Sequence, residues 1–372
     1  ETGGKNSTIV SHFADRDLAI NSVIQSAFGH AGQKCSATSL LIITQTLADD
    51  PSFKSHLIDA AGSMPIGSAW DLNARVTPMI QPPQGALLSA LTTLEDGETW
   101  WLEPKPHPQN PSLWSPGIKG DVSPGSVSHT TEFFGPVLSV MIAKDLTQAI
   151  EWANATPYGL TSGFHSLDET EQVQFLETMN AGNLYINRTT TGAIVQRQPF
   201  GGRKGSCFGP GAKAGGPNYL SMFVHRAPAK LPANLDEHFT PTIRGVLDAW
   251  RGINLNLDGL AASYLDGMTS LNRLYDPTGL HGQDNLFRYQ FALPVLVLAF
   301  DDYEPQDLAA VHLALMISGN PFDIVAVGIP KTSDPVSIRH VLGSLISEAD
   351  WQNLVHQGTY SHIRVLGAMS DD

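Results

Sequence analysis

A glutamate and a cysteine near the start of the chain form a pair that suits acyl transfer. Glu1 heads the segment Glu1-Thr2-Gly3-Gly4-Lys5-Asn6, and Cys35 lies further along in Gly32-Gln33-Lys34-Cys35-Ser36-Ala37. A thiolate can attack a carbonyl carbon, and a carboxylate can activate the water that later releases the acyl group. Because glycine and polar residues surround Cys35, we expect a turn that presents the thiol rather than burying it.

The composition indicates a globular chain of two domains. A length of 372 residues is enough for two sizeable cores, and no run of about 18 apolar residues predicts a spanning helix. The formal charge of −14 argues against a nucleic-acid surface, which needs a basic stripe. Two cysteines cannot build a disulfide framework, which favours a cytoplasmic location. The 13 histidines show no metal-site spacing, so we expect no metal.

Alternating strands and helices are expected to position the reactive pair. Apolar runs predict strands at 7–11, 40–43, 137–143 and 184–186, and helical spacing predicts helices at 15–28, 51–61 and 145–154. The stretch 82–124, rich in Pro, Gly and Trp, is expected to form irregular crossings with short strands. This alternation predicts an α/β domain with a largely parallel sheet.

A change in composition predicts a linker at 227–240 between a catalytic domain, 1–226, and a second domain, 241–372. The second domain is helical in pattern over 240–274. It continues with strand 295–300, helix 305–317, strand 324–329, helix 335–346 and strand 363–366. This order is Rossmann-like. Asp301 and Asp302 follow its first strand where a glycine turn would hold a pyrophosphate, so we expect no nucleotide site there.

Four motifs in the same order resemble the aldehyde dehydrogenase superfamily. They are the two segments that contain Glu1 and Cys35, then Glu132-Phe133-Phe134-Gly135-Pro136-Val137 and Pro157-Tyr158-Gly159-Leu160-Thr161-Ser162-Gly163. The separation of Glu1 and Cys35 is also the one that the superfamily uses. The resemblance covers roughly residues 1 to 225 and implies the catalytic domain that carries the nucleophile.

The resemblance implies an NAD-dependent oxidation of an aldehyde. Cys35 would attack the aldehyde, hydride would pass to NAD, and Glu1 would activate the water that hydrolyses the thioester. Glu132 would bind the hydroxyls of the nicotinamide ribose, with Phe134 beside that ribose. The backbone of Thr2–Gly3 would touch the nicotinamide.

Two later segments resemble the L-glutamate γ-semialdehyde (pyrroline-5-carboxylate) branch, in particular the dehydrogenase domain of the bifunctional proline utilization A family. They run from Thr191 to Gly202 and from Lys213 to Leu220. In that branch the backbone of Gly192–Ala193 and the hydroxyl of Ser36 would hold the substrate carboxylate, and Phe200 would pack on the aliphatic chain. From the residues alone, a dehydrogenase of another semialdehyde stays open.

The resemblance also implies partners. The cofactor-binding half of such an enzyme is expected on a missing N-terminal part of the same polypeptide, so residues 1–372 alone are expected to be inactive. Segments between 277 and 321 resemble the extra C-terminal domain of long members of the proline utilization A family, which implies an assembly role and a homo-oligomer. FAD is expected only with an upstream proline dehydrogenase domain. The alternative is a non-catalytic scaffold, against which Glu1, Cys35 and Glu132 together argue.

Overall fold

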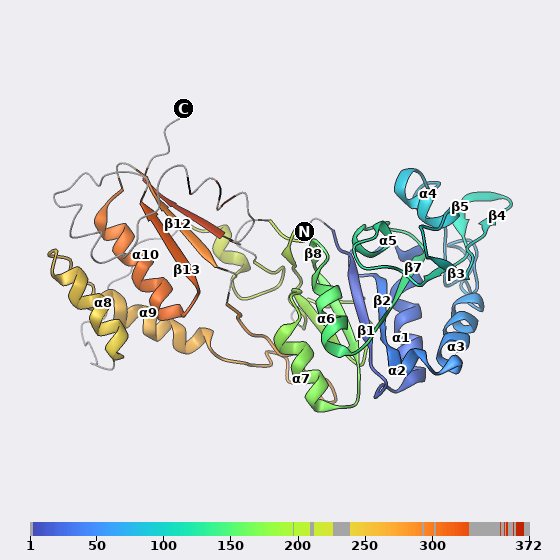
Figure 1. Cartoon of the computed structure of the whole chain (residues 1–372), viewed down its shortest axis with the longest axis horizontal. Helices are drawn as coiled ribbons and strands as arrows, with labels where there is room; N and C mark the ends of the chain where they lie inside the picture. The colour runs from blue at the N-terminus through green and yellow to red at the C-terminus, as the bar shows by residue number, and fades with distance from the viewer. Residues whose placement is uncertain are drawn as a thin grey trace. The chain divides into compact units, whose positions relative to one another are not determined.

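The chain forms two compact units, Glu1–Val224 and His225–Asp372, which are described separately. The structure, a computed structural model (Figure 1), describes residues 3–195, 197–208, 212–225, 239–291, 294–300, 303–326, 350, 353, 355, 360 and 362–367. Nearly all of the expected linker 227–240, the acids at 301–302 and the expected helix 335–346 lie outside these residues.

A seven-stranded sheet organises the first unit, in the order β10-β9-β1-β2-β7-β6-β3. The strands are β1 (Asn6–Val10), β2 (Thr38–Thr44), β3 (Thr99–Leu102), β6 (Gly117–Gly120), β7 (Val137–Ala143), β9 (Thr161–His165) and β10 (Asn183–Ile186). Neighbouring strands are parallel except β3, which pairs antiparallel with β6. Two small antiparallel pairs join β4 (Pro106–His107) to β5 (Asn110–Trp114) and β8 (Tyr158–Gly159) to β11 (Arg203–Lys204). The parallel-rich sheet confirms the predicted α/β class.

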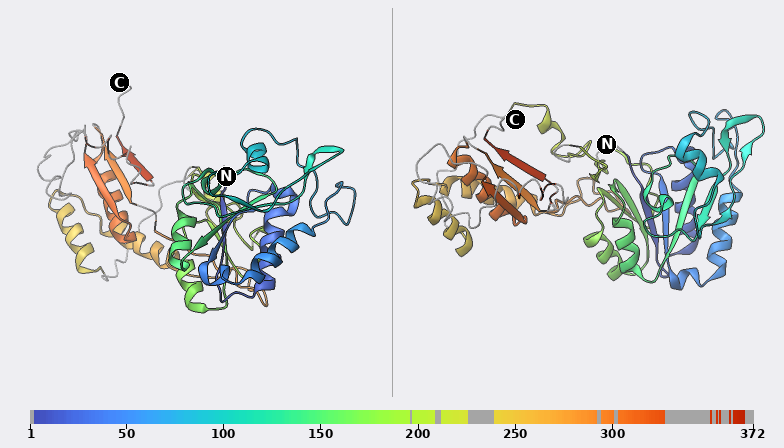
Figure 2. Two further views of the ribbon diagram at one scale, coloured as in Figure 1. Left: turned by 45° about the vertical axis from the view of Figure 1, so that its right-hand side comes forward. Right: turned by 45° about the horizontal axis from the view of Figure 1, so that its top comes forward.

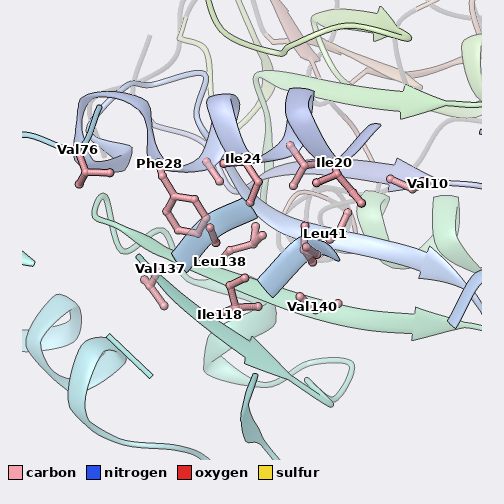
Figure 3. Packing of buried hydrophobic residues seen from close by; sticks show 14 of the residues in the cluster. Val10, Ile20, Ile24, Phe28, Leu41, Val76, Ile118, Val137, Leu138 and Val140 are labelled. Carbon is pink, nitrogen blue, oxygen red and sulfur yellow. The ribbon is translucent and has the colours of Figure 1, made fainter. Parts of the chain in front are cut away.

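Helices cover both faces of this sheet because its central strands are apolar on both sides (Figures 1 and 2). Val10, Leu41 and Ile43 pack on α1 (Arg16–Phe28) and α3 (Pro51–Gly62), in the core that Figure 3 shows. Their chain neighbours Ile9, Leu40 and Ile42 point to the opposite face and pack on α6 (Leu146–Asn154) and α7 (Glu169–Thr178). The remaining short helices are η1 (Gly29–Gly32), α2 (Gln45–Ala48), α4 (Gly85–Thr92), α5 (Val127–Thr130) and η2 (Tyr219–Met222).

The second unit contains a three-stranded parallel sheet in the order β13-β12-β14. Its strands are β12 (Val295–Ala299), β13 (Phe322–Ala326) and β14 (His362–Leu366), and its helices are α8 (Pro241–Arg251), α9 (Asp258–Leu271) and α10 (Pro305–Ser318). One face of β12, through Val297 and Ala299, packs on these helices. The expected helical region 240–274 and the strand–helix–strand order after it are confirmed as far as the structure describes them.

Three elements of the first unit differ from the sequence-based expectations. The stretch 82–124 contains the helix α4 as well as strands, although we expected only irregular crossings with short strands there. Strand β9 and helix α7 were not predicted. Among the described residues, no helix is long and apolar enough to cross a membrane, and no cluster of His, Cys, Asp and Glu could hold a metal ion.

Candidate active site

The candidate residues meet at the amino-terminal edge of the parallel sheet. Cys35 lies in the turn that leads into β2, Glu132 lies in the segment that leads into β7, and Gly3–Lys5 lead into β1. These three strands are neighbours, so their leading segments are brought side by side. In open α/β sheets the usual ligand site is at the carboxyl ends of the strands, so the general rule points to the opposite edge.

The side chain of Asn6 ties the nucleophile turn to the first strand. Its Nδ2 donates to the carbonyl oxygens of Cys35, at 2.7 Å, and Ala37, at 2.9 Å, and its Oδ1 accepts from the N–H of Thr161 at 3.1 Å. Asn6 is buried, so these bonds are shielded from water. The strand register shifts between Asn6 and Ser7, which gives the turn room to leave β2.

A row of threonine hydroxyls supports the same turn from the other side. Thr190 donates from Oγ1 to the carbonyl of Ser36 at 2.9 Å, and its hydroxyl lies 3.0 Å from that of Thr38. The Thr38 hydroxyl in turn lies 2.8 Å from that of Thr8 on β1. Two side chains therefore hold the backbone of the turn that contains Cys35. They are Asn6, on β1, and Thr190, which follows β10.

Glu132 is held against the backbone that precedes β1. Its Oε1 accepts the N–H of Gly4 at 3.0 Å. Gly3 has a φ of +143°, and a Cβ placed on it would lie 2.6 Å from Oε2 of Glu132. Only glycine combines that backbone conformation with so close an approach. Gly3 thus puts no side chain beside the carboxylate of Glu132.

Gln33 connects the nucleophile turn to the segment that carries Phe134. Its Nε2 donates to the carbonyl of Phe134 at 3.2 Å, and its Oε1 accepts the N–H of Ile80 at 3.0 Å. Gly32, with a φ of +69°, packs so closely that a Cβ there would lie 2.2 Å from the carbonyl oxygen of Gly135. The two loops are therefore in direct contact.

A shallow, open hollow lies between these loops. Gly4, Lys34, Thr38, Glu132 and Phe134 are among the residues that line it. Phe134 is 40% exposed, so its ring can meet a ligand, whereas Phe133 is buried. The hollow combines one carboxylate, backbone groups and an aromatic face, which suits a sugar with an attached ring.

Burial shapes the electrostatics beside the hollow. Burial raises the pKa of Glu132, while the Gly4 N–H and Lys5 oppose that rise. Lys5 is 3% exposed, its Nζ lies 5.0 Å from the centre of the Phe133 ring, and burial lowers its pKa to about 7 against the opposing pull of Glu132. When Lys5 is protonated, its charge favours the ionised form of Glu132.

Tyr185 on β10 lies close to the nucleophile. It is 4% exposed, and burial raises its pKa to about 12, with the charge of Cys35 adding to that rise and Arg188 opposing it. Cys35 itself is partly buried, and no disulfide joins it to Cys207. The structure thus brings Cys35, Glu132 and Tyr185 to one region of the first unit.

The predicted substrate residues lie at three places in the chain. Ser36 is buried directly beside Cys35. Gly192, with a φ of +91°, and Ala193 are exposed two and three residues beyond Thr190, the residue that bonds the Ser36 carbonyl. Phe200 is half-buried and pairs with Ala214 through a backbone bridge. Thr190 therefore links the first two of these places.

Two predicted residues, Glu1 and Thr2, lie outside the described residues. Other residues of the region were not singled out from the sequence. Asn6 and Gln33 stood inside the quoted motifs without a role, and Thr190 and Tyr185 had none either. Asn6 is followed by the polar residues Ser7 and Thr8, so its position gives no local signal. The partners of Thr190 lie more than 150 positions away in sequence.

The chain is similar to known proteins in sequence and in structure. The model of the aldehyde dehydrogenase family matches residues 1–227. A 1-pyrroline-5-carboxylate dehydrogenase of Geobacillus sp. (strain WCH70) is 36% identical over 227 residues, which are 60% of this chain and 43% of that protein. The structure of proline utilization A from Corynebacterium freiburgense has a TM-score of 0.80 and 38% identity over 98% of this chain and 36% of that chain.

A second solved structure, 1-pyrroline-5-carboxylate dehydrogenase from Thermus with bound NAD, is also similar. Its TM-score is 0.54 at 38% identity, over 60% of this chain and 42% of that chain. The chain thus spans less than half the length of each of these three relatives.

Proposed function

Since the chain belongs to the aldehyde dehydrogenase family, we propose that it supplies the nucleophile of an NAD-dependent dehydrogenase that oxidises L-glutamate γ-semialdehyde to glutamate. The relatives that carry the name 1-pyrroline-5-carboxylate dehydrogenase support this choice of substrate. The proposal concerns the complete gene product, because this chain spans 43% of such a relative.

One observation carries the proposal: a single short segment holds both the nucleophile turn and the candidate ribose ligand. Gly4 donates its N–H to Glu132, and two residues later Asn6 donates to the Cys35 carbonyl. The distance between thiol and cofactor in a hydride transfer must be tightly controlled. A rigid link of two residues provides that control.

The residues at the hollow fit the nicotinamide ribose of NAD. The Glu132 carboxylate lines the hollow and can accept hydrogen bonds from a sugar diol, and Gly3 puts no side chain beside it. Phe134, with its exposed ring, would pack beside the sugar. When bound there, NAD supplies the acceptor for hydride.

The chain's own groups account for the covalent steps. The Cys35 thiolate attacks the aldehyde carbon, and after loss of hydride the substrate is a thioester on Sγ. Glu1 removes a proton from the water that hydrolyses the thioester. Gly192, Ala193 and Ser36 hold the substrate carboxylate, for which backbone N–H groups in a glycine turn are suitable donors.

The test is NADH formation by the complete gene product. With pyrroline-5-carboxylate, which is in equilibrium with the semialdehyde, we expect turnover that depends on NAD, with a kcat/KM well above the values for propanal and succinate semialdehyde. Equal or higher kcat/KM for either comparison aldehyde would shift the assignment to another substrate. Absence of turnover with all three would favour the scaffold role.

A further inference from the structure

The ammonium group of Lys213 lies against the segment that carries Phe200. Its ammonium donates to the carbonyl oxygens of Gly182 and Gly201, the latter at 2.9 Å, and to Oδ1 of Asn183 at 3.1 Å. An ammonium group has three N–H donors, so these three acceptors match it fully. Burial lowers the pKa of Lys213 to about 8, in keeping with a cation removed from water.

Asn183 completes a brace around residues 199–201. Its Nδ2 donates to the carbonyl of Pro199 at 3.0 Å, and its Oδ1 accepts the N–H of Gly201 at 3.3 Å. Between them, Phe200 exchanges two backbone hydrogen bonds with Ala214, at 3.0 and 2.8 Å. The backbone on both sides of Phe200 is therefore fixed by contacts from β10 and from the residues at 213–214.

The same strand connects this brace to the nucleophile. Asn183 and Tyr185 are two residues apart on β10, so their side chains lie on one face of the strand, and both are buried. Tyr185 is close enough to both Cys35 and Asn183 for each to influence its ionisation. Hydrogen bonds therefore run from Asn183 on β10 to the segment of Phe200, and Tyr185 on the same strand lies within electrostatic range of Cys35.

We propose that Lys213 and Asn183 are positioning residues that hold Phe200 at a fixed place relative to Cys35, and that they thereby set the preference for the longer aldehyde chain. This inference rests on the proposed function, in which Phe200 packs on the aliphatic part of the substrate. A small aldehyde makes little use of Phe200, so loss of the brace should penalise the semialdehyde selectively.

Lys204 provides a matched control. It is also a lysine whose pKa burial lowers to about 8, and its Nζ also donates to backbone carbonyls, of Asn154 at 2.7 Å and Thr156 at 3.2 Å. Those carbonyls belong to the last residue of α6 and to the turn after it, and neither of these hydrogen bonds goes to residues 199–201. Lys204→Met therefore removes the same kind of buried cation without loosening the brace.

The experiment compares Lys213→Met and Lys204→Met in the complete gene product. We expect Lys213→Met to lower the ratio of kcat/KM for glutamate semialdehyde to kcat/KM for propanal by about tenfold, with the KM for NAD unchanged. Lys204→Met should leave the ratio unchanged. An unchanged ratio in Lys213→Met, or an equal fall in both variants, would overturn the proposal. If Lys213→Met has no thermal unfolding transition, Lys213→Arg, whose planar group cannot take the three acceptors in the same way, is judged by the same criterion.

Hydrogen exchange separates this inference from the proposed function. The N–H groups of Phe200 and Gly201 should exchange faster in the Lys213 variant than in the wild-type protein and in Lys204→Met. If the wild-type protein does not oxidise the semialdehyde, the proposed function fails, and the exchange result alone decides whether Lys213 positions Phe200. Unchanged exchange at these two residues would contradict the positioning role.

Discussion

Asn6 lies on β1, but its side chain forms hydrogen bonds with the turn that precedes β2. As both donors of its amide point to carbonyl oxygens, Asn6→Asp places a carboxylate against the oxygens of Cys35 and Ala37. We expect this change to lower the free energy of unfolding by about 2–4 kcal/mol and to reduce kcat. Denaturant unfolding and NADH formation measure the two effects.

Asn21→Asp is a suitable control for that prediction. Asn21 is exposed on α1, and its Oδ1 accepts from Gln25, a role that aspartate keeps. This control should leave both the free energy of unfolding and kcat near their wild-type values. An Asn6→Asp variant with wild-type stability and turnover would show that the hydrogen bonds from Asn6 to Cys35 and Ala37 are dispensable.

Glu132→Gln tests the ribose site. Because burial raises the pKa of Glu132, its ionised form is disfavoured by folding at neutral pH, so the neutral amide should not lower the free energy of unfolding. We expect the KM for NAD to rise about tenfold while the thermal midpoint stays in place. Titration with NAD and a thermal melt check both, with Glu177→Gln on the exposed side of α7 as control. A KM unchanged from the wild type would remove Glu132 from the site.

At the residue scale, the sequence predicts the candidate reactive groups but not the residues that hold them. Cys35 and Glu132 could be predicted because a motif of neighbouring residues surrounds each. Thr190 and Tyr185 could not, because their roles depend on contacts with residues far away in sequence. Hydrogen bonds between side chains and distant backbone carbonyls leave no periodic pattern in the chain.

At the scale of elements, apolar runs were sufficient for the buried strands. β2 and β7 carry unbroken apolar segments, as expected for parallel strands covered on both faces. β9 was not predicted because Gly163 interrupts its apolar pattern. The glycine is needed there because a Cβ would lie 2.9 Å from Cγ2 of Thr190. α7 was not predicted because Phe175 is its only buried residue, so its sequence shows only a weak helical periodicity of apolar residues.

The packing of α8 on α10 predicts a pH response in the second unit. Nε1 of buried Trp250 donates to Nδ1 of His312 at 3.1 Å, which requires a neutral imidazole, and burial lowers the pKa of His312 to about 4. The unfolded chain therefore binds more protons than the folded one between about pH 4 and pH 6.5. Stability should fall as the pH is lowered through that window, by up to about 3 kcal/mol.

The effect of His312→Phe on stability should depend on pH across this window. Near pH 7 it leaves the Trp250 N–H without its acceptor and should cost about 1–3 kcal/mol. Near pH 4.5 the wild-type protein bears the protonation penalty and the variant does not, so the difference should shrink or change sign. Hydrogen exchange of α8 and α10 at both pH values measures it locally. An equal loss of stability at both pH values would show that protonation of His312 does not weaken its interaction with Trp250.

At the scale of the whole molecule, the change in composition near residue 227 predicts a linker between two domains, and the structure forms two compact units, Glu1–Val224 and His225–Asp372. What the sequence could not supply was the edge of the sheet at which the site forms. The resemblance named the residues, and only the strand order places the leading segments of β1, β2 and β7 side by side. Strand order depends on long-range pairing, which local patterns do not encode.

The length of the relatives leads to a prediction about activity. Since the chain spans 43% of a matching 1-pyrroline-5-carboxylate dehydrogenase, residues 1–372 produced alone should form no NADH from pyrroline-5-carboxylate. The complete gene product should form it under the same conditions. Turnover by residues 1–372 alone would mean that these residues contain a whole cofactor site.

The most direct measurement of the central claim is the site of acylation. The complete gene product is mixed with NAD and pyrroline-5-carboxylate, quenched in acid during turnover, digested and examined by mass spectrometry. The account predicts a glutamyl thioester on the peptide that contains Cys35, none on the peptide that contains Cys207, and no NADH formation in Cys35→Ala. An adduct on Cys207, or undiminished turnover in Cys35→Ala, would contradict it.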